Sequence, residues 1–145
     1  MNLEMVFSVA GMLAMAGWVM LLLSPFAPDL ADKIAGWIIP LVLSVGYVVL
    51  AVFYSSWGEE GGYGSLADVA KLFSNQHALL AGWIHYLAFD LLIGAWICRV
   101  AQREAIRFWW VVPCLVLTFL FGPAGFLLFA LLRWAAAPAK ARKAG

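Results

Sequence analysis

"NQHALLAGWIHYLAFDLLIGAW", residues 75–96, is apolar enough to cross a lipid bilayer, yet it contains His77, His85 and Asp90. Ionisable side chains at the centre of a membrane helix cost roughly 2.5–3.5 kcal/mol each on insertion scales. A chain that keeps such residues must give them partners or use them. This stretch therefore predicts a membrane-spanning helix and marks where on it function is to be sought.

The composition of the whole chain agrees with a protein embedded in lipid. Of its 145 residues, 66% are hydrophobic and only 12% are charged, which is too little charge for the polar shell of a soluble domain. Crossing a hydrocarbon core of about 30 Å takes about 20 apolar residues. We therefore predict an all-α polytopic membrane protein, a single four-helix bundle with spans at about 3–23, 34–57, 77–98 and 108–132.

The polar residues gather between the spans and at the end of the chain. Residues 58–76 form the longest loop, in which "SLADVAKLF" has a capping serine and the apolar spacing of a short interfacial helix. Residues 134–145 are predicted to be a basic, flexible tail. Four spans place both termini on one side, and the basic tail favours the cytoplasmic side. A first span that begins almost at Met1 is typical of a bacterial inner-membrane protein.

Several kinds of cofactor site are disfavoured by residue placement. A net charge of +1 predicts no nucleic-acid partner. The two cysteines, Cys98 and Cys114, form no CxxC motif, and we expect both to be small buried residues. Both histidines lie on one helix, which argues against a bis-histidine haem, and no lysine lies in a span to hold retinal. We predict no cofactor. A metal remains an open alternative, with the candidate ligands His77, His85, Glu59 and Glu60.

Helical geometry separates the ionisable residues of the third span. At 100° per residue, with His77 at zero, His85 lies at roughly 80° and Asp90 at roughly 220°, so they do not share a face. Tyr86 precedes Asp90 by four residues and can hydrogen-bond to it. A central helix can line one cavity with two of its faces. The sequence therefore leaves open whether His85 and Asp90 act together in one site. The alternative is that Asp90 merely joins helices together. Other polar groups that could join the site are Tyr47, Tyr54 and Thr118.

"WIHYLAFDLLIGAW" (83–96), followed by "FGPAGFLLFALLR" (121–133), resembles the abscisic-acid-deficient-4-like family of small four-helix membrane proteins. The family includes a plant plastid member that is required to make neoxanthin. Its pattern is Trp-x-His and then Asp-Leu on the third helix, with Pro-x-Gly on the fourth. In this chain the pattern falls on Trp83, His85, Asp90, Leu91, Pro123 and Gly125.

The resemblance implies an isomerisation of a carotenoid-like isoprenoid. Neoxanthin forms when the epoxide of violaxanthin opens while a nearby carbon loses a proton, which requires a general acid and a general base in a dry slot. In this interpretation His85 and Asp90 divide the acid and base roles, and Tyr86 orients Asp90. The residues expected to contact or leave room for the polyene are Trp83, Gly94, Gly122, Pro123 and Gly125.

Two other functions compete with an isomerase. A non-catalytic subunit that holds a polyene or serves pigment or quinone metabolism fits the aromatic content equally well. A channel or transporter is disfavoured because few polar groups line four spans, unless the chain forms a homo-oligomer. The expected partners are the lipid bilayer and a lipophilic polyene or related isoprenoid.

Overall fold

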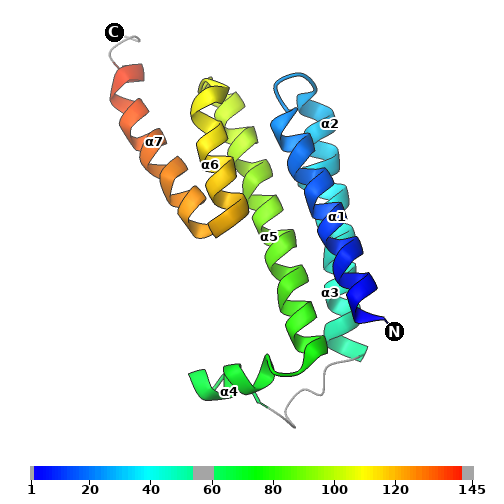
Figure 1. Cartoon of the computed structure of the whole chain (residues 1–145). Coiled ribbons are helices and arrows are strands. Elements are labelled where there is room, and N and C mark those ends of the chain that lie inside the picture. Colours follow the sequence, from blue (N-terminus) through cyan, green and yellow to red (C-terminus); the bar gives the residue numbers. More distant parts are fainter. Residues whose placement is uncertain (1, 54–60, 142–145) are drawn as a thin grey trace.

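The computed structural model describes residues 2–53 and 61–141, and the described chain is built of helices (Figure 1). Side chains are described as far as residue 135. Tyr54, Glu59 and Glu60 lie outside the described residues. In chain order the helices are α1 (Leu3–Leu22), α2 (Pro28–Lys33), the π-helical turn η1 (Ile34–Ile38), α3 (Ile39–Phe53), α4 (Leu66–Leu72), α5 (Gln76–Arg103), α6 (Phe108–Phe121) and α7 (Pro123–Ala141).

Three of the described helices are long and apolar enough to cross a membrane: Leu3–Leu22, Pro28–Phe53 and Gln76–Arg103. The 20 residues of α1 span about 30 Å at a rise of 1.5 Å per residue, which matches the hydrocarbon core. Met12, Leu41 and Val52 are each 64% exposed, as expected for side chains that face lipid. The predicted membrane protein is therefore supported by helix length and by an apolar outer surface.

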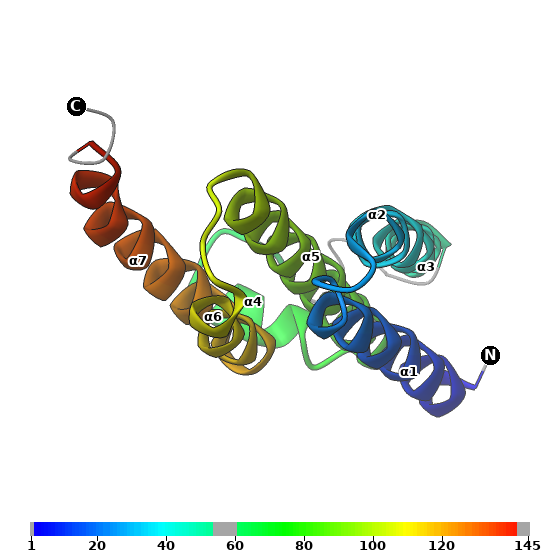
Figure 2. The same ribbon diagram turned by 90° about the horizontal axis from the view of Figure 1, so that it is seen from above.

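Helix α5 occupies the centre of the bundle and contacts α1, α3 and α6 (Figure 2). Small residues allow its close approach to α1, because a Cβ at Gly17 would lie 2.5 Å from Leu91 Cδ2. Gly94 faces α1 in the same way, with an added Cβ 2.7 Å from Leu21 Cδ1. On α1 itself the small residues Ala10, Ala14 and Gly17 are buried, which fits this close packing.

The second long helix begins earlier than predicted. It starts at Pro28. Proline has no backbone N–H, and it is tolerated in the first turn of a helix because an N–H there has no intrahelical acceptor. An ion pair of 2.8 Å joins Asp32 in this turn to Arg99 on α5. Arg99 thus ties the second long helix to α5.

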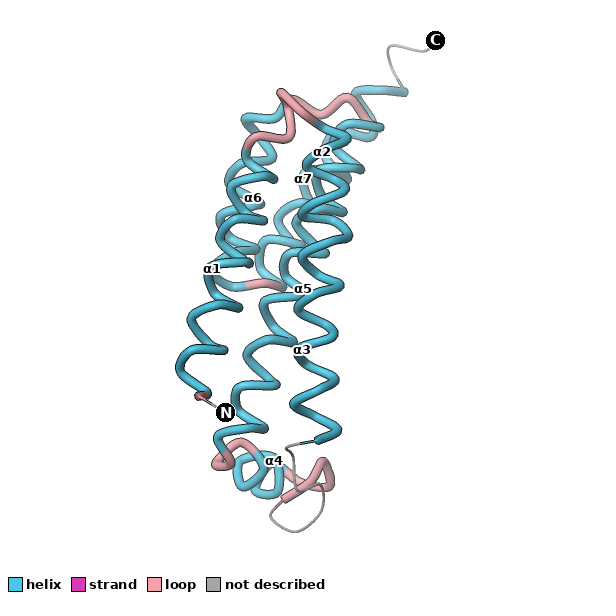
Figure 3. The backbone as a smooth tube through the Cα atoms, turned by 90° about the vertical axis from the view of Figure 1, so that its right-hand side faces the viewer, coloured by secondary structure: helices cyan, strands magenta, loops and turns pink. Residues whose placement is uncertain are grey.

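The structure does not confirm the fourth span, predicted at 108–132, as one continuous helix. α6 ends at Phe121, Gly122 adopts a φ of +37°, and α7 starts at Pro123. α7 then turns back along α6, so the two form a helical hairpin whose bend lies beside the middle of α5 (Figure 1). The described N- and C-terminal segments consequently lie at opposite ends of the bundle (Figure 3), not on one side as four spans predicted.

The short interfacial helix and the tail have different outcomes. α4 forms as predicted, and the side chain of Ser65 accepts the backbone N–H of Asp68 as its N-cap. α4 lies across the end of the bundle, near the N-terminal end of α5 (Figure 3). The expected flexible tail is helical as far as Ala141, because α7 continues through it. An ion pair between Arg133 and Glu104 ties α7 to the α5–α6 connection.

Candidate functional site

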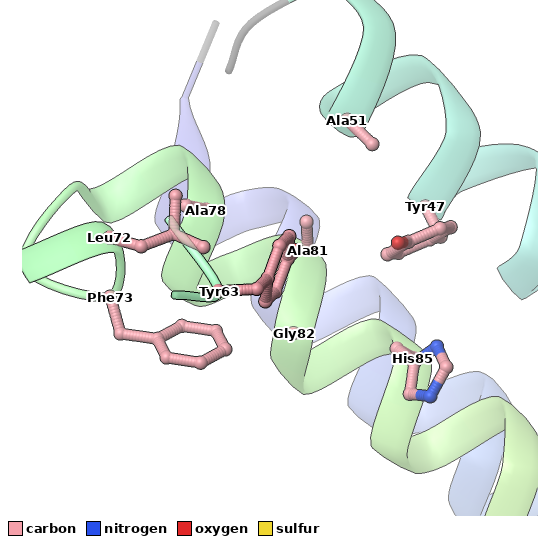
Figure 4. A pocket seen from close by; sticks show the side chains of 9 residues that line it. All are labelled: Tyr47, Ala51, Tyr63, Leu72, Phe73, Ala78, Ala81, Gly82 and His85. Atoms are coloured by element: carbon pink, nitrogen blue, oxygen red, sulfur yellow. The ribbon is translucent and has the colours of Figure 1, made fainter. Parts of the chain in front are cut away.

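A cavity of about 300 Å³ lies where α3 and α5 meet the α4 end of the bundle (Figure 4). Small side chains on α5 and α3 provide its space, and aromatic side chains surround it. Gly82 lets the ring of Phe73 lie against α5, since an added Cβ would come 2.6 Å from Phe73 Cε1. The lining residues are Tyr47, Ala51, Tyr63, Leu72, Phe73, Ala78, Ala81, Gly82 and His85.

His85 is the imidazole of this cavity, and aromatic rings hold it on two sides. Its ring stacks on Phe89, one turn later on α5, with centroids 4.5 Å apart and an angle of 20° between the planes. The Tyr47 ring on α3 lies 5.5 Å from the His85 ring (Figure 4). The side chains of His85 and Tyr63 are exposed, so the cavity is open to the surroundings of the bundle. The His85 imidazole can therefore be reached from outside the bundle.

Asp90 lies on the other side of α5 and lines none of the described cavities. It is at the midpoint of this 28-residue helix and is 7% exposed. Its carboxyl lies against the bend between α6 and α7, because a Cβ at Gly122 would be 2.7 Å from Asp90 Oδ1. The Oδ2 atom has no hydrogen-bond partner among the described residues. The separation of His85 and Asp90 predicted from helical geometry is therefore present.

Tyr86 lies beside Asp90, as its position one turn earlier predicts, and its side chain interacts with the carboxyl. Its hydroxyl also lies 3.4 Å from the carbonyl oxygen of Phe119 and 3.5 Å from that of Leu120. Trp83 stacks on Tyr86 with ring centroids 5.5 Å apart. Trp83 lies in a groove of about 340 Å³ between the first turns of α1 and α5, not in the cavity of His85.

Of the other residues expected to leave room for a polyene, the three glycines instead sit in close helix packing. The space beside Gly94 is filled by Trp18 and Leu21 of α1. A Cβ at Gly125 would lie 2.1 Å from Thr118 Oγ1, so this glycine allows α7 to rest on α6. Gly122 is covered by Asp90, and Pro123 is the exposed first residue of α7.

No group of three or more His, Cys, Asp or Glu side chains that could hold a metal occurs among the described residues. His77 does not line the cavity of His85, and Glu59 and Glu60 lie outside the part of the chain that the structure describes. The metal alternative thus gains no support from the described residues.

Two aromatic lining residues of the cavity, Tyr63 and Phe73, were among those not identified from the sequence. They come from the loop before α4 and from the residue that ends α4. The available signal was an interfacial helix flanked by aromatic residues in the longest loop. That signal does not say against which helices the loop folds, which depends on tertiary packing.

Comparison with known proteins agrees with the resemblance seen in the sequence. Searches of curated proteins and of solved structures gave no match. A family model described as ABA DEFICIENT 4-like matches residues 5–129, which include the three long helices, α6 and the start of α7. The matched region contains His85 with its cavity and Asp90 with the α6–α7 bend. Because the match covers most of the chain, this protein belongs to the ABA DEFICIENT 4-like family.

Proposed function

We propose that this protein is a membrane-embedded isomerase that acts on the oxygenated ring of a carotenoid-like isoprenoid. Family membership supports a role in carotenoid- and neoxanthin-related processes. The observation that carries the proposal is the aromatic cavity of about 300 Å³ with the His85 imidazole in its wall. It combines a binding place for an apolar ring with an imidazole, a group that serves as acid or base in many enzymes.

The size and opening of the cavity define which part of the substrate it would hold. Small-molecule sites range from about 300 to 1,000 Å³, and this cavity lies at the lower limit. It is too small for a whole C40 polyene but suits one terminal ring. Because Tyr63 and His85 are exposed, the polyene chain can extend from the cavity along the apolar surface of the bundle.

The proposed reaction opens an epoxide and forms an allene with no change in composition. His85 removes a proton from the chain carbon next to the ring. The C–H electrons form a new double bond, and the epoxide C–O bond breaks. A tyrosine hydroxyl, from Tyr47 or Tyr63, gives its proton to the released oxygen. Proton return from the imidazolium to the phenolate then restores both groups.

The aromatic lining adds electrostatic support to this chemistry. Positive charge develops on the ring carbon as the C–O bond breaks, and the faces of aromatic rings stabilise cations. Tyr47 and Phe73 provide such faces in the cavity wall. Stacking on Phe89 restrains the plane of the His85 ring before substrate binds. Asp90, on the opposite face of α5, takes no part in these steps.

The test is conversion of an epoxide-bearing carotenoid in a host that makes one. The pigments of cells with wild-type protein, His85→Gln and Arg103→Gln would be extracted and resolved by liquid chromatography with mass spectrometry. Arg103 is exposed at the far end of α5, which makes it the matched control. We expect a product of unchanged mass and new retention time with wild type and Arg103→Gln, and its loss with His85→Gln. Pigments identical to those of the empty host would contradict an isomerase.

A non-catalytic pigment-binding subunit is the second candidate, because the lining of the cavity is mostly apolar and aromatic. The same samples distinguish the two functions. A binding subunit purified in mild detergent carries an unconverted carotenoid in stoichiometric amount, and His85→Gln leaves the cellular pigments unchanged.

A further inference from the structure

Asp90 presents a buried carboxyl to the point where a neighbouring helix is interrupted. The residue is 7% exposed, and its Oδ2 atom has no hydrogen-bond partner among the described residues. Gly122, between α6 and α7, has a positive φ and no side chain, which lets the carboxyl lie directly against the bend. A side chain there would meet Asp90 Oδ1 at 2.7 Å. The Asp90 carboxyl therefore occupies the space that a side chain at position 122 would need.

The Tyr86 hydroxyl connects this carboxyl to the last turn of α6. The last turn of a helix leaves carbonyl groups without intrahelical partners, and α6 ends beside Asp90. The Tyr86 hydroxyl, next to the carboxyl, lies 3.4 Å from the Phe119 carbonyl and 3.5 Å from the Leu120 carbonyl. Hydroxyl hydrogen bonds are usually about 2.7–2.8 Å long, so these contacts leave both carbonyl oxygens able to accept another partner.

Among the described residues, the ion pairs of arginine side chains do not include Asp90. Arg99 is paired with Asp32, and Arg133, near the middle of α7, is paired with Glu104. An isolated ionised carboxylate is very costly away from water, so the group needs a bound cation or a proton. In membrane proteins the carbonyl ends of interrupted helices, together with a carboxylate, provide sites for Na⁺.

We propose that Asp90, the Tyr86 hydroxyl and the carbonyl oxygens of Phe119 and Leu120 form a binding site for Na⁺. One carboxylate balances one positive charge, which favours a monovalent ion over Ca²⁺ with its six to eight oxygen ligands. A bound ion links the α6–α7 bend to the middle of α5. The site lies on the face of α5 opposite to the cavity of His85, so it stands independently of the proposed isomerase.

The test measures Na⁺ binding to the purified protein in mild detergent. The unfolding temperature is recorded while Na⁺ replaces choline at constant ionic strength, and radioactive Na⁺ gives the stoichiometry. We expect a saturable rise in unfolding temperature with about one ion per chain, because a ligand that binds only the folded state stabilises it. Asp90→Asn should lower the affinity roughly tenfold or more, equivalent to at least 1.4 kcal/mol. Tyr86→Phe should lower it several-fold.

The matched control is Asp29→Asn, which removes an exposed carboxyl at the start of α2 and should bind Na⁺ like wild type. Asn has nearly the shape of Asp, so the Asp90→Asn protein can be checked for native helix content before binding is measured. A wild-type protein whose stability depends on pH but not on Na⁺ would overturn the proposal and leave Asp90 as a protonated helix contact. An equal Na⁺ response in Asp90→Asn would overturn it as well.

Discussion

Gly125→Ala is the substitution that most directly tests the α6–α7 hairpin. An added Cβ would lie 2.1 Å from Thr118 Oγ1, 2.2 Å from Thr118 N and 2.4 Å from Cys114 O. Two of these atoms belong to the backbone of α6 and cannot rotate away. Thr118 is fully buried, and its hydroxyl donates to the Cys114 carbonyl at 2.7 Å. Its side chain therefore cannot rotate away without losing this hydrogen bond. The hairpin must therefore open by about an ångström to reach ordinary contact distance.

The expected loss follows from two opposing effects. Overpacking a close contact costs about 1–3 kcal/mol, and alanine gains about 0.5–1 kcal/mol over glycine within a helix. We expect Gly125→Ala to lower the free energy of unfolding by about 1–2 kcal/mol. The assay is unfolding of the detergent-solubilised protein by SDS, followed by helical circular dichroism.

Two glycines in open positions provide controls for Gly125→Ala. Gly11 in α1 and Gly46 in α3 have nothing within 4 Å of an added Cβ. Gly11→Ala and Gly46→Ala should therefore leave stability unchanged or raise it by about 0.5–1 kcal/mol. If Gly125→Ala is as stable as these controls, α7 does not rest on α6 as described, and the reasoning from close packing fails.

Two further predictions concern local features. Ser65→Ala removes the N-cap of α4, and we expect the free energy of unfolding to fall by about 1 kcal/mol. Proteolysis of the variant should be faster at α4 than at α5, and equal cleavage of wild type and variant would contradict the cap. Cys98 and Cys114 are 5% and 0% exposed, so a membrane-permeant maleimide should label the native protein far more slowly than the SDS-unfolded protein. Rapid labelling of native Cys114, measured by intact mass, would show that α6 is not packed as described.

The membrane helices could be predicted because their signal is local. Three long helices lie where unbroken apolar stretches placed them, since length and apolarity alone decide whether a segment suits a bilayer. The fourth apolar stretch was equally hydrophobic, and its interruption at Gly122 and Pro123 was visible as "FGPAG". Whether such a break kinks a helix or reverses the chain depends on the contacts of α7 with α6. The sequence therefore predicted the apolar residues but not the hairpin.

For the candidate site, too, local sequence information predicted one part, and tertiary packing decided the rest. Helical geometry placed His85 and Asp90 on different faces of one helix, and the structure has them so. The residues that contact each face of α5 lie outside α5 itself. Tyr47 reaches His85 from α3, and the bend at Gly122 reaches Asp90 from a segment thirty-two residues later in the chain. No periodicity in α5 specifies which neighbours cover its two faces.

The five-residue step from His85 to Asp90 keeps the two sites that we propose on different faces of α5. It moves the side chain about 7.5 Å along α5 and roughly 140° around it, so a ring held in the cavity meets His85 while Asp90 stays beneath the hairpin. The open face suits an apolar ligand that must enter and leave through lipid. The closed face suits a small charge that must be kept from lipid. Because both groups are fixed to one rigid helix, the hairpin can stabilise the position of α5 without contacting whatever the cavity binds.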